Sequence, residues 1–235
     1  MIVWIASFPR SGNNLFREAL FRIFGVKSGS VFPEPLGADP YLDDVSLHLP
    51  EDSIDSLREQ EAPVFVKTHR LSEVEDPSPA VYLVRDGRDA YVSYAHFVRA
   101  RGERAFTSLD YEGALAALIE REDHAYGSWS ASVRAWTRRD GPTAIVRFEE
   151  LVENPHTAIR AAAESLDLPL GEPVGEMPPF RELHAQNPIV FRRGKVGSWR
   201  SELPPELEER FWGLHGREML AMGYPRKHPL VAAPS

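Results

Sequence analysis

The chain has 235 residues, of which 43% are hydrophobic and 26% charged, so it is long enough to bury a full hydrophobic core. This composition excludes a disordered tail, a fibrous repeat and a small domain held together by disulfides or metals. The sequence contains no cysteine, which also excludes a thiolate metal cluster and a cysteine nucleophile. Since no linker divides the chain, we expect one domain over residues 1–224 and a flexible tail at 225–235.

The acidic charge is concentrated in one segment. The formal net charge is −8, and residues 31–62 hold nine acidic side chains against a single arginine. This segment therefore accounts for the whole excess, and any anion site must be a local group of arginines and lysines on a neutral body. The charge argues against nucleic acid or an anionic membrane as a partner. The oligomeric state stays open, with a homodimer among the options.

The apolar opening, Met1 to Phe8, is far shorter than the roughly 20 residues that span a bilayer. It also lacks a basic flank and a small-residue cleavage pattern. We therefore expect a soluble, cytoplasmic protein.

Short apolar runs alternate with segments of helical periodicity. The runs predict strands at residues 2–7, 63–67, 80–84 and 143–148. The periodic segments predict helices at residues 15–24, 89–99, 111–139 (one helix, or two that meet near Gly127), 155–168 and 205–222. Between them, residues 28–50 contain four prolines and two glycines and predict an irregular segment. Strands that alternate with helices indicate parallel crossovers, so the predicted fold is a single three-layer α/β domain with a central parallel sheet.

The first predicted strand leads into the first helix through Phe8-Pro9-Arg10-Ser11-Gly12-Asn13-Asn14. A loop of this kind directs backbone N–H groups and the positive end of a helix at one point, which suits a phosphate. The loop is P-loop-like but differs from G-x-x-x-x-G-K-[ST], because asparagines follow Gly12 where that motif has its lysine and hydroxyl. By itself the loop is more typical of an ordinary turn than of an anion site.

Three further polar clusters follow predicted strands or lie in a late loop. Lys67-Thr68-His69 follows the second strand, and Arg85 to Asp89 follows the third, with Ser93 one turn into the next helix. The late loop, residues 191–200, holds four basic residues around two glycines. Ligands of open parallel sheets bind at the carboxyl ends of the strands, so we expect the clusters to form one anion site with the first loop.

These segments, in this order over residues 7 to 200, resemble the sulfotransferases that use 3′-phosphoadenosine 5′-phosphosulfate (PAPS). Ser7 to Leu15 is similar to the family's phosphosulfate loop, YPKSGTTW, and Lys67 to His69 matches its KTH segment. Val81 to Phe97 resembles the 3′-phosphate motif, and Arg192 to Trp199 the RKGxxGDW loop. The departures from the pattern are Arg10 for lysine, Asn13 and Asn14 for two threonines, Leu15 for tryptophan, and Ser198 for aspartate.

The resemblance implies transfer of a sulfuryl group from PAPS to a hydroxyl or amine of a small-molecule or natural-product acceptor, with release of PAP and without a metal. It implies that Arg10 stabilises the leaving phosphate, that Lys67 binds the sulfuryl oxygens and that His69 is the general base. The donor site that it implies consists of Arg10, Ser11, Gly12, Asn13, Asn14, Leu15, Arg85, Ser93, Phe148, Phe180, Arg192, Arg193 and Gly194.

Each of these residues also has a purely structural interpretation. The arginines of the two phosphate motifs are alternatively surface ion pairs with Asp86, Asp89 or Glu202, an interpretation that suits Arg88 and Lys195 best. The two phenylalanines are alternatively part of the core.

Two other functions compete with sulfuryl transfer. A P-loop nucleotide or small-molecule kinase is disfavoured because the first loop lacks the motif's lysine. A nucleotide-binding module without turnover is disfavoured because the chain retains both Lys67 and His69.

Overall fold

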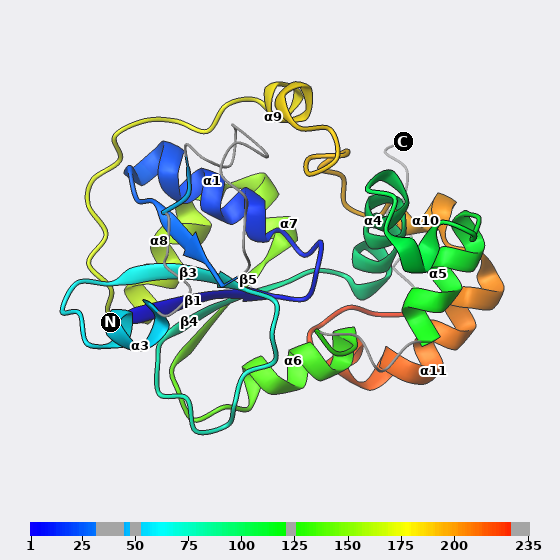
Figure 1. Cartoon of the computed structure of the whole chain (residues 1–235), viewed down its shortest axis with the longest axis horizontal. Coiled ribbons are helices and arrows are strands. Elements are labelled where there is room, and N and C mark those ends of the chain that lie inside the picture. Colours follow the sequence, from blue (N-terminus) through cyan, green and yellow to red (C-terminus); the bar gives the residue numbers. More distant parts are fainter. Residues whose placement is uncertain (32–44, 48–52, 121–125, 227–235) are drawn as a thin grey trace, which may run out of the picture.

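The computed structural model describes residues 1–31, 45–47, 53–120 and 126–226. A parallel five-stranded sheet in the order β2-β3-β1-β4-β5 lies at its centre (Figure 1). The strands are β1 (Ile2–Ser7), β2 (Ser28–Ser30), β3 (Val64–Thr68), β4 (Ala80–Val84) and β5 (Thr143–Arg147). The predicted α/β fold with a parallel sheet is confirmed. Strand β2 falls in the segment predicted as irregular, and residues 32–44 and 48–52 of that segment lie outside the described residues.

Helices connect the strands and extend beyond the sheet. They are α1 (Asn13–Phe24), α3 (Ser53–Arg58), α4 (Gly87–Ala100), α5 (Tyr111–Glu120), α6 (Trp129–Thr137), α7 (Phe148–Glu153), α8 (Pro155–Ser165), α9 (Phe180–Gln186), α10 (Trp199–Glu202) and α11 (Pro205–Ala221), with a 3₁₀ turn at Arg104–Phe106. None of the helices in the described part of the chain is long and apolar enough to cross a membrane.

Several predicted boundaries shift. Of the two alternatives for residues 111–139, the structure has two helices, α5 and α6, and residues 121–125 between them lie outside the described residues. The prediction that the fourth strand reaches Phe148 is wrong, because Phe148 is the first residue of α7. Helix α8 starts as predicted, since the Asn154 side chain accepts a hydrogen bond from the Thr157 N–H at 3.0 Å, but it ends at Ser165 rather than 168.

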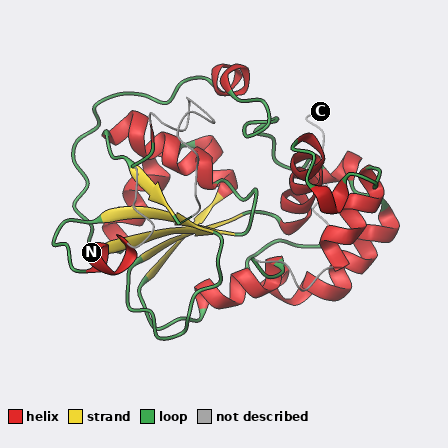
Figure 2. Ribbon diagram, in the orientation of Figure 1, coloured by secondary structure: helices red, strands yellow, loops and turns green. Residues whose placement is uncertain are grey.

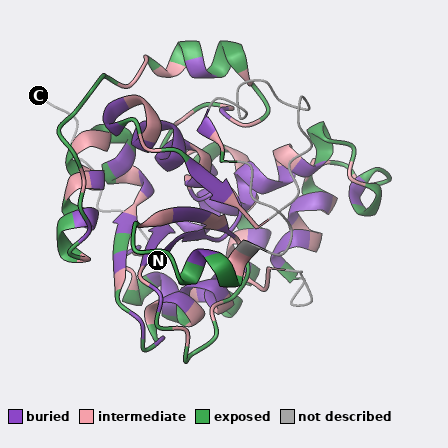
Figure 3. Ribbon diagram, turned by 60° about the vertical axis from the view of Figure 1, so that its left-hand side comes forward, coloured by how far each residue is buried: buried purple, intermediate pink, exposed green. Residues whose placement is uncertain are grey.

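The two faces of the sheet pack against different helices, which gives three layers (Figure 2). Along β1, the side chains of Ile2, Trp4 and Ala6 belong to a core shared with α4, α5, α6 and α11. Val3 and Ile5 point to the opposite face, into a core shared with α1, α7 and α8. Burial on both faces explains why the strand reads as an unbroken apolar run, and Figure 3 shows the sheet as buried.

The parallel register brings the polar clusters to one edge. Ile5 pairs with Lys67 and Ala6 with Thr68, while on the other side of β1 Ser7 pairs with Leu83. The first loop, the Lys67-Thr68-His69 segment and Arg85 therefore all leave the sheet at its carboxyl edge.

Arg88 has a structural role, in agreement with the ion-pair interpretation of this residue in the sequence analysis. Its side chain is fully buried, lies 2.7 Å from Asp86 and stacks 3.7 Å from the ring of Trp199. Its guanidinium also donates to the carbonyls of Pro225 and Arg226 at 3.1 and 3.0 Å. The last described residues are thus attached to the start of α4. The predicted boundary at 224 stays a prediction, and residues 227–235 of the tail lie outside the described residues.

The start of α4 has no room for a larger side chain. A Cβ placed on Gly87 would lie 2.8 Å from Cζ of Phe211 and 3.1 Å from Cδ2 of Trp129, both fully buried. We therefore expect Gly87→Ala to destabilise the fold by about 1–3 kcal/mol in urea unfolding.

The control is Gly213→Ala in α11, where, apart from neighbouring residues and the backbone of the helix itself, no described atom lies within 4 Å of the new methyl group. We expect this variant to gain about 0.5–1 kcal/mol, because alanine favours a helix over glycine. Equal stability of the two variants would show that α4 and α11 do not pack as described.

Candidate active site

The loop between β1 and α1 has the backbone of an anion-binding loop. Arg10 and Gly12 adopt positive φ angles of 66° and 105°, and a Cβ on Gly12 would approach Phe148 to 2.8 Å. The N-cap residue of α1 is Gly12, which has no side chain to accept from the N–H groups of the first turn, and these groups have no intrahelical acceptors. The buried Ser11 hydroxyl also has no hydrogen-bond partner among the described residues. The loop therefore offers donors to a bound anion.

Two of the next three predicted donor-site residues, Asn13 and Leu15, are tied to the core. The Asn13 side-chain amide donates to the carbonyl of Ile5 at 2.9 Å and to the Ser7 hydroxyl at 3.3 Å. Leu15 is buried in the core cluster that contains α7 and α8. Asn13 and Asn14 each keep a buried side-chain carbonyl oxygen that has no partner among the described residues.

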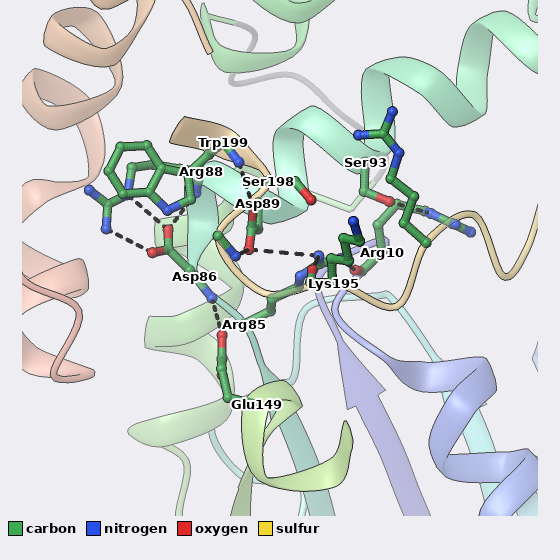
Figure 4. A network of polar contacts seen from close by, with 12 residues as sticks. Arg10, Arg85, Asp86, Arg88, Asp89, Ser93, Glu149, Lys195, Ser198 and Trp199 are labelled. Carbon is green, nitrogen blue, oxygen red and sulfur yellow. Dashed lines mark hydrogen bonds and ion pairs between the residues drawn. The ribbon is translucent and has the colours of Figure 1, made fainter. Parts of the chain in front are cut away.

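Arg10 points away from the loop toward α4 and the late loop (Figure 4). Its Nε donates to the Ser93 hydroxyl at 3.2 Å, and one terminal nitrogen donates to the carbonyl of Val190 at 2.7 Å. The guanidinium lies 4.7 Å from the ring of Phe97. Burial, together with the charges of Arg85 and Arg192, lowers the pKa of Arg10 to about 9. The site thus holds an excess of buried positive charge that a bound anion would relieve.

Arg85 connects the first loop to the late loop. It donates to the carbonyl of Arg10 at 3.1 Å and to the carbonyl of Lys195 at 2.9 Å, and it lies 3.8 Å from Asp89 (Figure 4). Its guanidinium stacks 4.2 Å from the ring of Phe148. Its Nε is buried and has no acceptor in the part of the chain that the structure describes.

The late loop is fixed to α4 and α9. The Asp89 carboxylate accepts from the N–H groups of Gly197 at 2.6 Å and Trp199 at 2.9 Å. Gly194 has a φ of 60° and lies so close to Phe180 that a Cβ would approach its ring to 2.5 Å. Phe180 is half-buried beside the loop, whereas Phe148 is buried in the core. The core location of Phe148 agrees with the structural alternative given in the sequence analysis.

Arg192 and Arg193 both form ion pairs with Glu202, at 3.0 and 2.7 Å. This pairing is one of the structural alternatives that the sequence left open. Even so, Arg192 lies close enough to Arg10 and Arg85 for its charge to lower the pKa of both. The four arginines of the predicted donor site therefore form one group.

His69 is held against the end of β1. Its Nδ1 lies 2.8 Å from the carbonyl oxygen of Ser7. A carbonyl only accepts, so Nδ1 carries the proton and Nε2 keeps its lone pair. Burial and the charge of Lys67 lower the pKa of His69 to about 3, so the ring is neutral at physiological pH. The ring of Tyr126 meets the imidazole edge-on at 5.7 Å.

The structure thus brings the predicted residues to one edge of the sheet and adds partners that the sequence did not indicate. The carbonyls of Ile189 and Val190 accept hydrogen bonds from Arg10. Every residue has a backbone carbonyl, so the residue types at these positions do not predict the contact. Tyr126 belongs to no motif, and it lies inside the predicted helical stretch 111–139, so the sequence does not mark it as a site residue.

Comparison with known proteins agrees with this geometry. A family model described as sulfotransferase domain matches residues 2–223. Mouse sulfotransferase 1B1 is 27% identical over 71% of this chain and 64% of its own length, so this match spans slightly less than two thirds of that relative. Mouse sulfotransferase 1A1 is 25% identical over 89% of this chain and 81% of its own length.

Solved structures share the fold. Mouse sulfotransferase SULT7A1 complexed with PAP has a TM-score of 0.64 at 19% identity, covering 92% of this chain and 83% of its own. Retinol dehydratase in complex with androsterone and PAP has a TM-score of 0.59 at 15% identity, covering 93% of this chain and 80% of its own. The family match covers nearly the whole chain and includes all the loops that carry the predicted motifs. The chain therefore belongs to the sulfotransferase domain family.

Proposed function

We propose that this sulfotransferase transfers the sulfuryl group of PAPS to a hydroxyl or amine of a small-molecule acceptor and releases PAP. The observation that carries the proposal is the convergence of the first loop, the start of α4 and the late loop around Arg10 and Arg85. These two arginines join the segments through Ser93 and the carbonyl of Lys195. The PAP-bound structures that share the fold support PAPS as the donor.

The residues present fit a donor with two anionic ends. The unpaired Ser11 hydroxyl and the first-turn N–H groups of α1 suit the 5′-phosphosulfate, and Arg10, whose side chain reaches from this loop to Ser93, lies between the two anionic ends. Ser93, Arg192, Arg193 and the unpaired Nε of Arg85 suit the 3′-phosphate, since charge-assisted hydrogen bonds are the strong ones. Phe180, half-buried beside Gly194, is the aromatic surface for adenine, and the buried Phe148 supports Arg85 beneath it.

Sulfuryl transfer is an in-line displacement in which negative charge grows on the bridging oxygen of the leaving phosphate. By analogy with phosphoryl transfer, positioning and charge stabilisation supply the catalysis. Arg10 stabilises that oxygen as a cation, because a pKa of about 9 still leaves it protonated at neutral pH. Lys67 orients the sulfuryl oxygens, and no step requires a metal.

His69 takes the proton of the acceptor hydroxyl at Nε2. The hydrogen bond from Nδ1 to the carbonyl of Ser7 fixes the tautomer in which Nε2 carries no proton. General base catalysis of this kind contributes about 10²- to 10⁴-fold.

Aromatic side chains lie next to both proposed catalytic residues. Tyr126 lies against His69, and Phe97 lies against Arg10. We propose that the acceptor carries its hydroxyl or amine on an apolar or aromatic body. The androsterone and retinol bound by retinol dehydratase structures of the same fold support a small molecule.

The direct test is to incubate the protein with PAPS and a panel of phenols, alcohols and amines and to look for products heavier by one SO₃ unit. Turnover of Mg-ATP in place of PAPS would indicate the kinase alternative. Binding of PAP without any product across the panel would favour a module that does not turn over.

Replacing Arg10 and replacing His69 should have different effects on turnover and on PAP binding. Arg10→Ala removes a cation that contacts the donor, so we expect loss of most turnover and much weaker PAP binding by calorimetry. His69→Ala removes only the base, so turnover should fall by about 10²- to 10⁴-fold while PAP binds as before. The exposed Arg99 provides the control, since Arg99→Ala should change neither quantity. Full activity of His69→Ala at neutral pH would assign the base elsewhere.

The low pKa of His69 predicts an unusual pH profile. A histidine with a pKa of about 3 stays neutral as the pH falls from 8 to 5, so kcat/KM should show no acid limb from this residue. The measurement needs an alcohol acceptor that does not titrate in this range. An acid limb with a midpoint near 6.5, the ordinary pKa of histidine, would contradict the lowered pKa of His69.

Arg193 should recognise the 3′-phosphate alone. Arg193→Ala should weaken the binding of PAP more than that of adenosine 5′-phosphosulfate, which lacks the 3′ group. One charged hydrogen bond corresponds to about tenfold or more in affinity. Equal losses for the two nucleotides would remove Arg193 from the 3′-phosphate site.

A further inference from the structure

The two arginines assigned to the 3′-phosphate already hold an anion that belongs to the chain. Glu202 Oε2 accepts from Arg192 at 3.0 Å, and Oε1 accepts from Arg193 at 2.7 Å. His96 Nε2 donates to Oε2 at 2.7 Å. Three basic side chains therefore meet at one carboxylate.

Glu202 is held in place by its backbone as well as by its side chain. It is the last residue of the short helix α10, whose first residue, Trp199, donates its N–H to Asp89 of α4. The hydroxyl of Tyr111 donates to the carbonyl of Glu202 at 3.0 Å, and the same tyrosine stacks on His96 with centroids 4.7 Å apart. The carboxylate is thus fixed from α4, α5 and the late loop, unlike an ordinary mobile surface ion pair.

The carboxylate is charged and largely removed from water. Its side chain is only 14% exposed. Burial works against its ionisation, but hydrogen bonds from Arg192 and His96 outweigh this and hold the pKa of Glu202 below its usual value. In the donor-free protein an anion therefore already neutralises part of the cationic site.

Resting on the 3′-phosphate site proposed above, we propose that Glu202 is a resident anion of that site, which the 3′-phosphate of the donor displaces from Arg192 and Arg193. The guanidinium N–H groups that Glu202 occupies are those that a phosphate would take. Binding of PAPS exchanges one anion for another, and Glu202 keeps His96 as its partner.

This exchange sets nucleotide affinity and selectivity. PAPS and PAP carry the same 3′-phosphate, so the carboxylate weakens the binding of donor and product alike and speeds the release of PAP. A nucleotide without a 3′-phosphate does not compete for these arginines. Glu202 therefore lowers the preference of the site for 3′-phosphorylated nucleotides from what the arginines alone would give.

The opposite role is that Glu202 orients the arginines for the phosphate and remains in place when the nucleotide binds. The two roles predict opposite effects of removing the charge. Competition predicts tighter binding of PAP, whereas orientation predicts weaker binding.

The test is Glu202→Gln, which keeps the size of the side chain and removes its charge. Calorimetry should show PAP bound about tenfold tighter, since a charged contact is lost only from the free protein, with 5′-AMP unchanged. Stopped-flow displacement should show slower release of PAP. Glu202→Ala is the second variant and should shift PAP affinity in the same direction.

The matched control is Glu206→Gln, which removes the same charge from an exposed position four residues further on. Glu206→Gln should change the affinity for neither PAP nor 5′-AMP. If both glutamine variants bind PAP more tightly, the effect comes from net charge alone and the proposal is overturned. Unchanged or weaker PAP binding in Glu202→Gln would also overturn it. If Arg193→Ala weakens PAP selectively in that case, the 3′-phosphate site stands and only the role of Glu202 fails. If Arg193→Ala has no selective effect, the 3′-phosphate assignment itself fails and the proposal with it.

Discussion

The site depends on one guanidinium at the end of β4. Arg85 donates to the carbonyl of Arg10 in the first loop and to the carbonyl of Lys195 in the late loop, which lie 185 residues apart in sequence. The parallel sheet delivers Arg85 and the first loop to the same edge, and Asp89, one turn further along, fixes the late loop by two N–H groups. The distance between the two proposed phosphate sites is therefore set by buried hydrogen bonds rather than by mobile surface loops.

The electrostatics of the site follow from this gathering of cations. The pKa of Arg10 is depressed by burial and by Arg85 and Arg192, and the pKa of His69 is depressed by burial and by Lys67. The same crowding has two useful consequences. It favours the binding of an anionic donor, and it keeps the imidazole of His69 neutral. A single physical cause thus sets both the positive charge of the donor site and the protonation state of His69.

The elements that the sequence predicted well are those whose signal is local. The apolar run of β1 and the loop at Gly12 need only their own residues, and both appear as expected. Strand β2 is Ser-Gly-Ser and owes its existence to pairing with β3, so no apolar run marks it. The sequence named Glu202 as a possible partner of the arginines but could not choose between ion pair and phosphate site, because that choice depends on where α10 lies relative to α4. The carbonyls that receive Arg10 carry no sequence signal at all.

The attachment of residues 225 and 226 to Arg88 ties the far end of the described chain to the helix that presents Ser93. Two of the acceptors that satisfy this buried guanidinium are backbone carbonyls just past the last helix, beyond the domain end inferred from composition. A protein trimmed at residue 224 would lose these two acceptors. Among the described residues, the guanidinium would keep only the carboxylates of Asp86, whose side chain caps α4, and Glu208 as hydrogen-bond acceptors. A purification tag is therefore better placed where it leaves this short stretch undisturbed.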